Sequence, residues 1–286
     1  MKLLLLLVLV SITLIACGSE NYTNNGATQT IVSIGPSNTE ILMELGLTDR
    51  IIAIDTISID IPNVPSNLTL VDMWAVDAES LLVLQPDIII ATDMILAIGA
   101  DPLALLSQSG IRVEYIRVGE TISQVKEDIL FIAELVGEIQ AGEVIVANMN
   151  TEISRIQQIA SGISNRRVVY FEIDAPPFMF SFGTDTFLNE LLETIGAINL
   201  FADQSGWLSI SDEQIFARDP DVILTNVDWM DDPVAEIISR PGWSGLTAVQ
   251  ENRIYVIEAN ASSRPSHNII NALQQMAMAV YPEYFS

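Results

Sequence analysis

Short, continuous apolar runs alternate with amphipathic helical patterns along the chain after residue 30. The runs are rich in β-branched residues, which predicts buried strands. In the first half the expected strands are residues 31–34, 51–54, 88–91 and 112–116, and in the second half they are residues 168–172, 222–224 and 253–257. Strands that alternate with helices are typical of parallel sheets covered by helices, so the pattern predicts an α/β fold.

One helix-strand unit occurs twice, at residues 77–91 and at residues 211–225. In each copy a capping side chain, Asp77 or Ser211, begins a short helix, and Ser211 forms a capping box with Gln214. A Pro-Asp pair then ends the helix and leads into an apolar strand. The two copies therefore predict the same local structure in both halves of the chain.

A second pair of helices repeats in the same order. Ser37 with Glu40 predicts a capping box, and Gly46 is placed to close that helix. Residues 186–196 repeat its apolar spacing and its closing Gly. Chance similarity between α/β units is the alternative explanation, but two pairs in order favour a real repeat. The repeat predicts two similar lobes.

Residues 138–163 lie between the two halves and carry apolar side chains at mostly helical spacing. A helix there would be about 35 Å long, which is enough to run along both lobes. We therefore expect an N-terminal lobe of residues 31–137, this bridging helix, and a C-terminal lobe of residues 164–286. A single helical connector is stiff, so we expect little closure of the lobes.

The first 16 residues predict an export signal peptide. A short positive start precedes an apolar run of about 13 residues, which is shorter than the roughly 20 that span a bilayer. Leu14 to Cys17 resembles the bacterial lipobox, in which the Cys becomes lipidated; an ordinary signal peptide with an incidental Cys is the alternative. We expect residues 17–30 to be the lipidated Cys and a flexible polar tether. The lipid on Cys17 would anchor the protein to the cell membrane on its extracytoplasmic side.

The chain has 286 residues and a formal net charge of −25. Such a surface repels nucleic-acid phosphates, so nucleic acid is not an expected partner. The acidity fits either solubility in a salty or alkaline exterior or attraction to a basic membrane partner. Cys17 is the only Cys, which excludes disulfides, thiolate nucleophiles and Cys-ligated metals from the mature protein.

The sequence carries no recognisable catalytic constellation. His267 is the only His, and Gly242-Trp-Ser244-Gly lacks the spacing of a nucleophile elbow. A phosphate-binding Gly loop and a metal-binding cluster of His and Cys are also missing from the sequence. We therefore expect a protein that is not an enzyme, with a secreted α/β hydrolase as the remote alternative. His267 follows an expected C-lobe strand, where α/β proteins bind ligands, although a surface or capping role is also open.

Aromatic residues supply the strongest sign of a binding site. Trp74 precedes the first repeated helix and Trp207 precedes the second. Equivalent positions in facing lobes would place both indoles at the cleft, where a flat, partly apolar ligand is sandwiched between them. Phe178 and Phe180, and Phe182 beyond them, follow an expected strand and are placed to join the cleft wall. Ordinary packing within each lobe is the alternative.

Glu79 and Glu213 are the second symmetric signal. Each lies in the first turn of a repeated helix, one in each half of the chain. A carboxylate there is stabilised by the helix dipole, by roughly 0.3–1 kcal/mol. The same placement suits two charged residues that dock on basic sites of a two-subunit membrane partner. The two interpretations are compatible.

Several of these motifs together resemble the cobalamin and ferric-siderophore binding proteins of ABC importers. They are residues 31–40, 77–87 and 211–221, and Arg264-Pro265 before the last helix. The resemblance implies two Rossmann-like lobes with parallel-rich sheets, joined by one long helix as in periplasmic binding proteins with a helical backbone. It also implies a monomer that delivers its ligand to an ABC permease dimer with ATPase subunits, and that Glu79 and Glu213 meet arginines on that dimer.

The resemblance is strongest to the cobalamin-binding members, because Trp74 and Trp207 match positions of aromatics against the corrin ring. Residues 55–62 depart from that pattern, since cobalamin binders often carry a Tyr there and this chain has none. A ferric siderophore is an alternative ligand, for which Arg264 and two further arginines are available. Haem is another, for which Met73 and His267 are possible axial ligands. The two further arginines available to a siderophore are Arg112 and Arg117. In each case the expected ligand is a small metal chelate.

Overall fold

The computed structural model describes residues 29–285 of the chain. The predicted signal peptide, Cys17 and nearly all of the tether lie outside the described residues. Two separate parallel sheets form the centres of two lobes, which confirms the predicted α/β fold. Among the described residues, none of the helices combines the length and apolar character needed to cross a membrane.

The N-terminal sheet has five parallel strands in the order β3-β2-β1-β4-β5. The chain first builds the sheet outward from β1 in one direction and then returns to add β4 on the other side of β1. The point between β1 and β4, where the order reverses, is where open α/β sheets bind ligands. The strands are β1 (Ile31–Ile34), β2 (Ile51–Asp55), β3 (Thr69–Val71), β4 (Ile88–Thr92) and β5 (Arg112–Ile116).

The C-terminal sheet repeats this arrangement with four parallel strands in the order β11-β10-β6-β8. In it β6 takes the place of β1, and β10, which follows the second repeated helix, takes the place of β4. A separate two-stranded antiparallel sheet, β7 with β9, is added beside it. The strands are β6 (Val168–Glu172), β7 (Phe180–Phe182), β8 (Ile198–Asn199), β9 (Trp207–Ser209), β10 (Val222–Thr225) and β11 (Ile254–Val256).

Helices cover both faces of each sheet. Alternate residues of the central strands point to opposite faces, so that Ile31 enters one core and its neighbour Val32 enters another. The helices are α1 (Pro36–Glu44), α2 (Ala78–Leu84), α3 (Ala104–Gln108), α4 (Ile122–Val136), α5 (Ile139–Ala160), α6 (Phe187–Thr194), α7 (Asp212–Phe216), α8 (Pro233–Ser239), α9 (Thr247–Gln250), α10 (Ala259–Ser263) and α11 (Ile269–Val280), with short 3-10 turns at Thr48–Arg50, Thr56–Asp60, Asp93–Ile98 and Trp243–Gly245.

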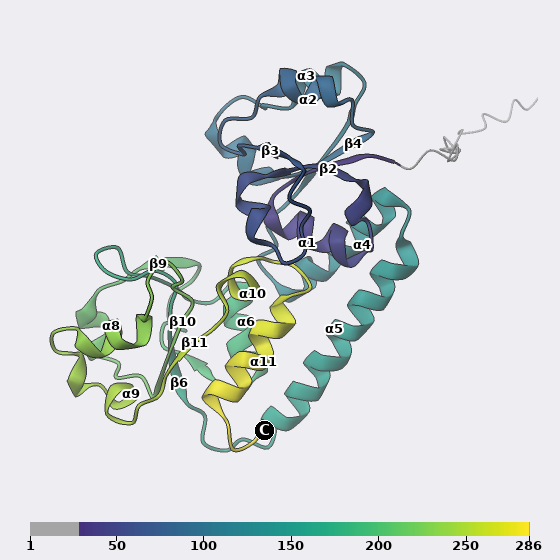
Figure 1. Ribbon diagram of the computed structural model, residues 1–286. Coiled ribbons are helices and arrows are strands. Elements are labelled where there is room, and N and C mark those ends of the chain that lie inside the picture. The colour runs from purple at the N-terminus through teal and green to yellow at the C-terminus, as the bar shows by residue number, and fades with distance from the viewer. Residues whose placement is uncertain (1–28, 286) are drawn as a thin grey trace, which may run out of the picture.

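The predicted bridging helix is α5, which has 22 residues and is therefore about 33 Å long. It runs beside both lobes, with α11 next to it (Figure 1). Gly142 permits a close approach to α4, because a Cβ at this position would lie 2.5 Å from the Cβ of Ala133. Apolar residues of α5 and α11 and of one face of each sheet form a single continuous core. The two lobes are therefore joined by packing as well as by the chain.

The helix caps agree with the sequence at the repeated helices and differ at α1. The Asp77 carboxylate caps α2, and the capping box of Ser211 with Gln214 is present at α7. The capping box predicted for Ser37 and Glu40 is wrong. Gly35 is the N-cap of α1, Pro36 takes the first helical position, and Glu40 is turned into the protein, where it binds side chains of the other lobe.

Candidate functional site

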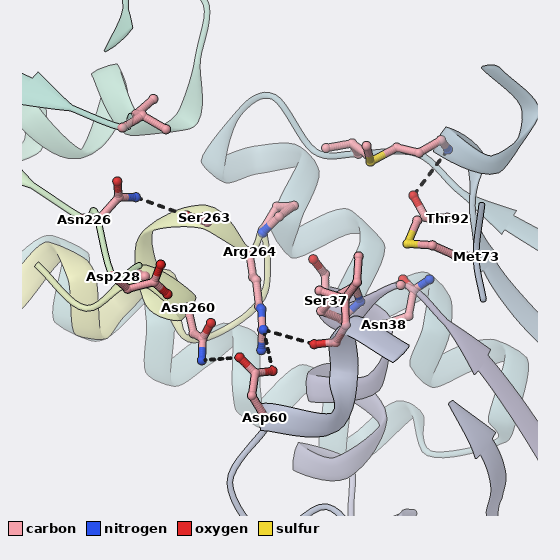
Figure 2. Close-up of a pocket in the computed structure, with 18 of the residues that line it drawn as sticks. Ser37, Asn38, Asp60, Met73, Thr92, Asn226, Asp228, Asn260, Ser263 and Arg264 are labelled. Carbon is pink, nitrogen blue, oxygen red and sulfur yellow. Dashed lines mark hydrogen bonds and ion pairs between the residues drawn. The ribbon is translucent and has the colours of Figure 1, made fainter. Parts of the chain in front are cut away.

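A cavity of about 760 Å³ lies between the lobes. It is bordered by the segments that follow the carboxyl ends of β1 to β5 in the N-terminal lobe and of β6, β10 and β11 in the C-terminal lobe. Both sheets therefore direct the same edge toward one cleft, as expected of ligand sites in open α/β sheets. Figure 2 shows the cleft between Thr92 and Met73 on one side and Asn226 and Asp228 on the other.

The N-lobe wall is built where β1, β2 and β4 end. Gly35 has a φ of +117°, and a Cβ on it would lie 3.1 Å from the Cβ of Thr92, so only Gly suits this position. The Gly35 N–H donates to Asp55 Oδ2 at 2.8 Å, and the Ser58 hydroxyl donates to the same oxygen at 2.6 Å. These contacts hold the ends of β1, β2 and β4 together as one wall of the pocket.

Aromatic side chains enter the pocket from both lobes. Trp74, 48% exposed, comes from the N-terminal lobe, while Phe178, 80% exposed, and Phe180 come from the C-terminal lobe. Trp229 also lines the pocket and is 62% exposed. Its indole Nε1 donates to Asp174 Oδ1 at 3.2 Å, which holds the ring in place. A flat ligand in this cleft would contact aromatic rings on two sides.

The structure places Trp207 differently from the sequence prediction. It lies on strand β9 rather than in a loop, and it is not among the residues that line the pocket. Its ring stacks on Phe180 with the centroids 6.4 Å apart, and it packs edge-on against Phe182 and Phe187. Phe182 is fully buried. Trp207 thus packs against the pocket residue Phe180 without lining the cavity itself.

Trp229 takes the place in the pocket that Trp207 was predicted to take. Trp229 lies outside the repeated motif, so the symmetry of the sequence does not point to it. A signal was available: Trp229 follows closely after the expected strand at residues 222–224, at the strand end where α/β proteins bind ligands. The pocket thus contains one Trp from each lobe, Trp74 and Trp229, but these two residues do not occupy equivalent positions in the repeat.

A buried ion pair joins the lobes beside the pocket. Glu40 on α1 is 4% exposed and accepts hydrogen bonds from Arg264 Nη1 at 3.1 Å, from Asn268 Nδ2 at 3.1 Å and from the Ser266 hydroxyl. Arg264 Nη2 also donates to Asp60 Oδ1 at 2.7 Å (Figure 2). We call these five residues the interlobe latch. Arg264 lines the pocket, as predicted for a ligand contact, but its guanidinium is already bound by two carboxylates.

His267 lies next to the latch and does not line the pocket. Its Nε2 is 3.5 Å from Glu44 Oε2. Burial lowers the pKa of His267, and the charges of Glu44 and Glu40 oppose that shift. Met73 does line the pocket, so the structure does not bring this pair together there as haem ligands. No His, Tyr or Cys is among the residues that line the cavity, and the described part of the chain holds no metal-binding cluster of His, Cys, Asp and Glu.

Asp128 on α4 is a half-buried carboxyl in the pocket wall. Burial, together with the charges of Glu127 and Asp93, raises its pKa to about 6, although the charge of Arg117 acts to lower it. Arg117 also lines the pocket. Arg112, in contrast, is bound to Glu114 outside it. At neutral pH Asp128 is therefore mostly ionised and contributes to an acidic pocket.

The two predicted docking residues are both exposed. Glu79 lies in the first turn of α2 and Glu213 in the first turn of α7. A hydrogen bond from Ser211 lowers the pKa of Glu213, so this carboxylate stays ionised. Within residues 29–285 neither forms a salt bridge. Both charges are thus available to a partner.

Comparisons with known proteins agree with this architecture. Residues 31–261 match the family described as Periplasmic binding protein. The ABC transporter substrate-binding lipoprotein YvrC of Bacillus subtilis is 30% identical over 277 residues, which cover 96% of this chain and 87% of that protein. A cobalamin-binding protein of Halobacterium salinarum is 24% identical over 261 residues, covering 88% of this chain and 69% of that protein.

Solved structures share the fold as well. The periplasmic haem-binding protein HutB of Vibrio cholerae superimposes with a TM-score of 0.79 at 25% identity, covering 90% of this chain and 100% of that chain. The match extends across both lobes, so the strand order, the bridging helix and the cleft belong to a common architecture.

The latch generates a prediction about stability. Glu40→Ala removes the fully buried partner of Arg264 and leaves Asp60 as its remaining carboxylate. Removing one member of a buried ion pair is strongly destabilising, so we expect the free energy of unfolding in urea to fall by about 3 kcal/mol. The control is Glu251→Ala, which removes an exposed pair with Arg253 and should cost less than about 1 kcal/mol. Equal losses in the two variants would show that the latch does not stabilise the fold.

Proposed function

The chain belongs to the periplasmic binding protein family, and on that premise we propose that it is the extracytoplasmic substrate-binding lipoprotein of an ABC importer. In this role it binds a small molecule and passes it to a permease dimer driven by ATPase subunits, without changing the ligand chemically. The observation that carries the proposal is the cavity between the lobes, with exposed aromatic rings from both of them. It acts as a monomer, since one chain contributes both walls of the cavity.

The ligand we propose is cobalamin or a related corrinoid. A corrin is a broad, flat macrocycle with an apolar face, which suits a cleft walled by Trp74 on one side and by Phe178 and Trp229 on the other. Relatives that are named as cobalamin-binding or vitamin B12-binding proteins support this choice. The indole of Trp229 is held by Asp174, so little side-chain freedom is lost when a ligand binds.

Haem is the second candidate, and it is favoured by the likeness to the haem-binding protein of Vibrio cholerae. Two methionines, Met73 and Met94, line the pocket and have sulfur atoms that are possible iron ligands. The lining lacks the His and Tyr side chains that commonly hold haem iron, which favours the corrinoid. For a ferric siderophore, Arg117 is the one lining guanidinium outside the latch.

Fluorescence titration tests the ligand. Cyanocobalamin should quench the Trp emission of the wild-type protein at micromolar concentrations, because two Trp residues line the cavity. Trp74→Ala and Trp229→Ala should each weaken binding about tenfold through loss of aromatic contact. Trp207→Phe keeps a ring against Phe180 and should change affinity less than about twofold.

Two outcomes would contradict the corrinoid assignment. Absence of quenching by cyanocobalamin up to millimolar concentration would exclude it. A Soret band that develops on addition of haem, and that Met73→Ala or Met94→Ala shifts, would assign the pocket to haem. Persistence of that band in His267→Ala would agree with the position of His267 outside the cavity.

We further propose that Glu79 and Glu213 dock on the two halves of the permease dimer. Each is an exposed carboxylate at the start of the same repeated helix, so the pair matches a partner that is itself two-fold. Neither contacts the ligand pocket. Docking and ligand binding should therefore be separable.

The double variant Glu79→Ala with Glu213→Ala should bind ligand with unchanged affinity but should reduce uptake by the reconstituted importer at least about tenfold, because two charged contacts are lost. The charge-matched control is Glu134→Ala with Glu143→Ala, two exposed acidic residues on α4 and α5. Uptake by the control should equal that of the wild type. Normal uptake by the first variant would rule out the docking role.

The anchor we propose is the lipidated Cys17, with residues 1–16 removed as signal peptide and residues 17–30 as lipidated Cys and tether. The substrate-binding lipoprotein of Bacillus subtilis supports this assignment. Cys17→Ser should move the protein from the membrane fraction to the soluble extracytoplasmic fraction and abolish labelling with radioactive palmitate, because the thiol that carries the lipid is lost. Retention of the variant in the membrane fraction would show that another element anchors it.

A further inference from the structure

Asn226 is a buried polar residue in the wall of the pocket. It follows β10, is 5% exposed and lines the cavity. Its Nδ2 donates to the hydroxyl of Ser262 at 2.9 Å, and also to that of Ser263 at 3.0 Å, as Figure 2 shows. Its Oδ1 is buried and has no hydrogen-bond partner within the described residues. Both N–H groups of the amide are thus engaged by serines, and its oxygen has practically no accessible surface.

The orientation of this amide is determined by its neighbour. The Ser262 hydroxyl donates its single proton to the carbonyl oxygen of Glu258, at 2.8 Å. It can therefore only accept from Asn226, which assigns the NH2 group to the serine side and the oxygen to the unpaired position. Asn226 therefore has no free N–H group to donate to a carboxylate of a ligand.

Asp228 adds a charge to the same wall. It lies two residues after Asn226 and lines the cavity (Figure 2). Its side chain is exposed and forms no hydrogen bond or salt bridge with any other described residue. Asp174 on the same lobe accepts from the Trp229 indole and from a backbone N–H, and meets no cation there. This side of the pocket thus offers acceptors and negative charge.

The whole lining has an excess of negative charge. Arg264 is matched by Glu40 and Asp60 within the latch. Arg117 acts on Asp128, whose pKa it lowers. No further cation lines the cavity to balance the carboxylates of the C-terminal wall, and a cleft with apolar walls strengthens their field. Four carboxylates face two guanidinium groups around the pocket: Asp60, Asp128, Asp174 and Asp228 against Arg117 and Arg264.

We propose that the pocket selects its ligand by the chemical groups at the edge of the macrocycle. It binds a neutral or cationic macrocycle whose edge carries N–H donors, and it excludes a macrocycle whose edge carries carboxylates. This inference rests on the proposed function, because it assumes a flat macrocycle in the same cleft. Ligand N–H groups pair with the Asp228 carboxylate. A carboxylate at that edge would find no free donor on Asn226 and would be repelled by Asp228.

One ligand pair differs in this respect alone. Cyanocobalamin carries amide groups around its ring, and hydrolysis of its three propionamides gives a tricarboxylate with the same macrocycle. At 0.15 M NaCl, where the distant surface charges are screened, cyanocobalamin should bind at least about tenfold more tightly. The measurement is the ratio of the two dissociation constants from Trp fluorescence.

Asp228→Asn should reduce that ratio about threefold, because it removes the repulsion and keeps the shape. Asp231→Asn is the matched control. It makes the same change of net charge on an exposed residue of the same loop, outside the pocket lining, and should leave the ratio within about twofold of wild type. A tricarboxylate that binds as tightly as the amide form would overturn the inference, and so would a ratio that Asp228→Asn does not change.

Synthetic porphyrins separate a failure of this inference from a failure of the proposed function. If no corrinoid binds, the corrinoid assignment fails. A second pair of ligands with a common flat core then still tests whether the pocket selects by the groups at the ligand edge. Tetrakis(N-methylpyridinium)porphyrin should bind more tightly than tetrakis(sulfonatophenyl)porphyrin, with a preference that Asp228→Asn reduces and Asp231→Asn does not. Equal binding of the two porphyrins, or tighter binding of the sulfonate, would overturn the inference.

Discussion

The ion pair between Glu40 and Arg264 is the interaction on which the binding site depends. The two residues are 224 positions apart and come from opposite lobes, and both are nearly fully buried. A carboxylate in such a place is stable only with a cation and further donors, which the segment before α11 supplies. The pairing holds the carboxyl ends of the two sheets against each other. The position and width of the cleft follow from this contact together with the stiff helix α5.

Much of the fold could be read from the sequence, because the information was local and repeated. Continuous β-branched runs predicted the strands at the centre of both sheets, and helical spacing predicted α5 to within three residues at its end. Ser37 and Glu40 show where local reading fails. The pattern is that of a capping box, but Gly35 with Pro36 begins the helix equally well, and a distant Arg264 binds the Glu. No local rule contains that partner.

The binding site was harder to predict because it depends on differences between the repeats. The two-stranded sheet of β7 with β9 occurs only in the second lobe of the described structure, and it places Trp207 against Phe180 and outside the cavity lining. Trp229 has no counterpart in the repeated motif. The predicted aromatic character of the cleft agrees with the residues that line it, whereas the symmetric pairing of two indoles does not. The elements that the two lobes share form the scaffold, and the pocket chemistry lies in the segments that differ between the lobes.

The continuous core along α5 has a consequence for how such a molecule comes apart. One face of each sheet is covered by the same layer of helices, so neither half contains a complete apolar interior of its own. The described part of the chain should therefore unfold as one cooperative unit, because unfolding of one half exposes the apolar sheet face of the other half to water. A gene fragment that encodes a single half would yield a chain with a bare sheet face, prone to aggregate.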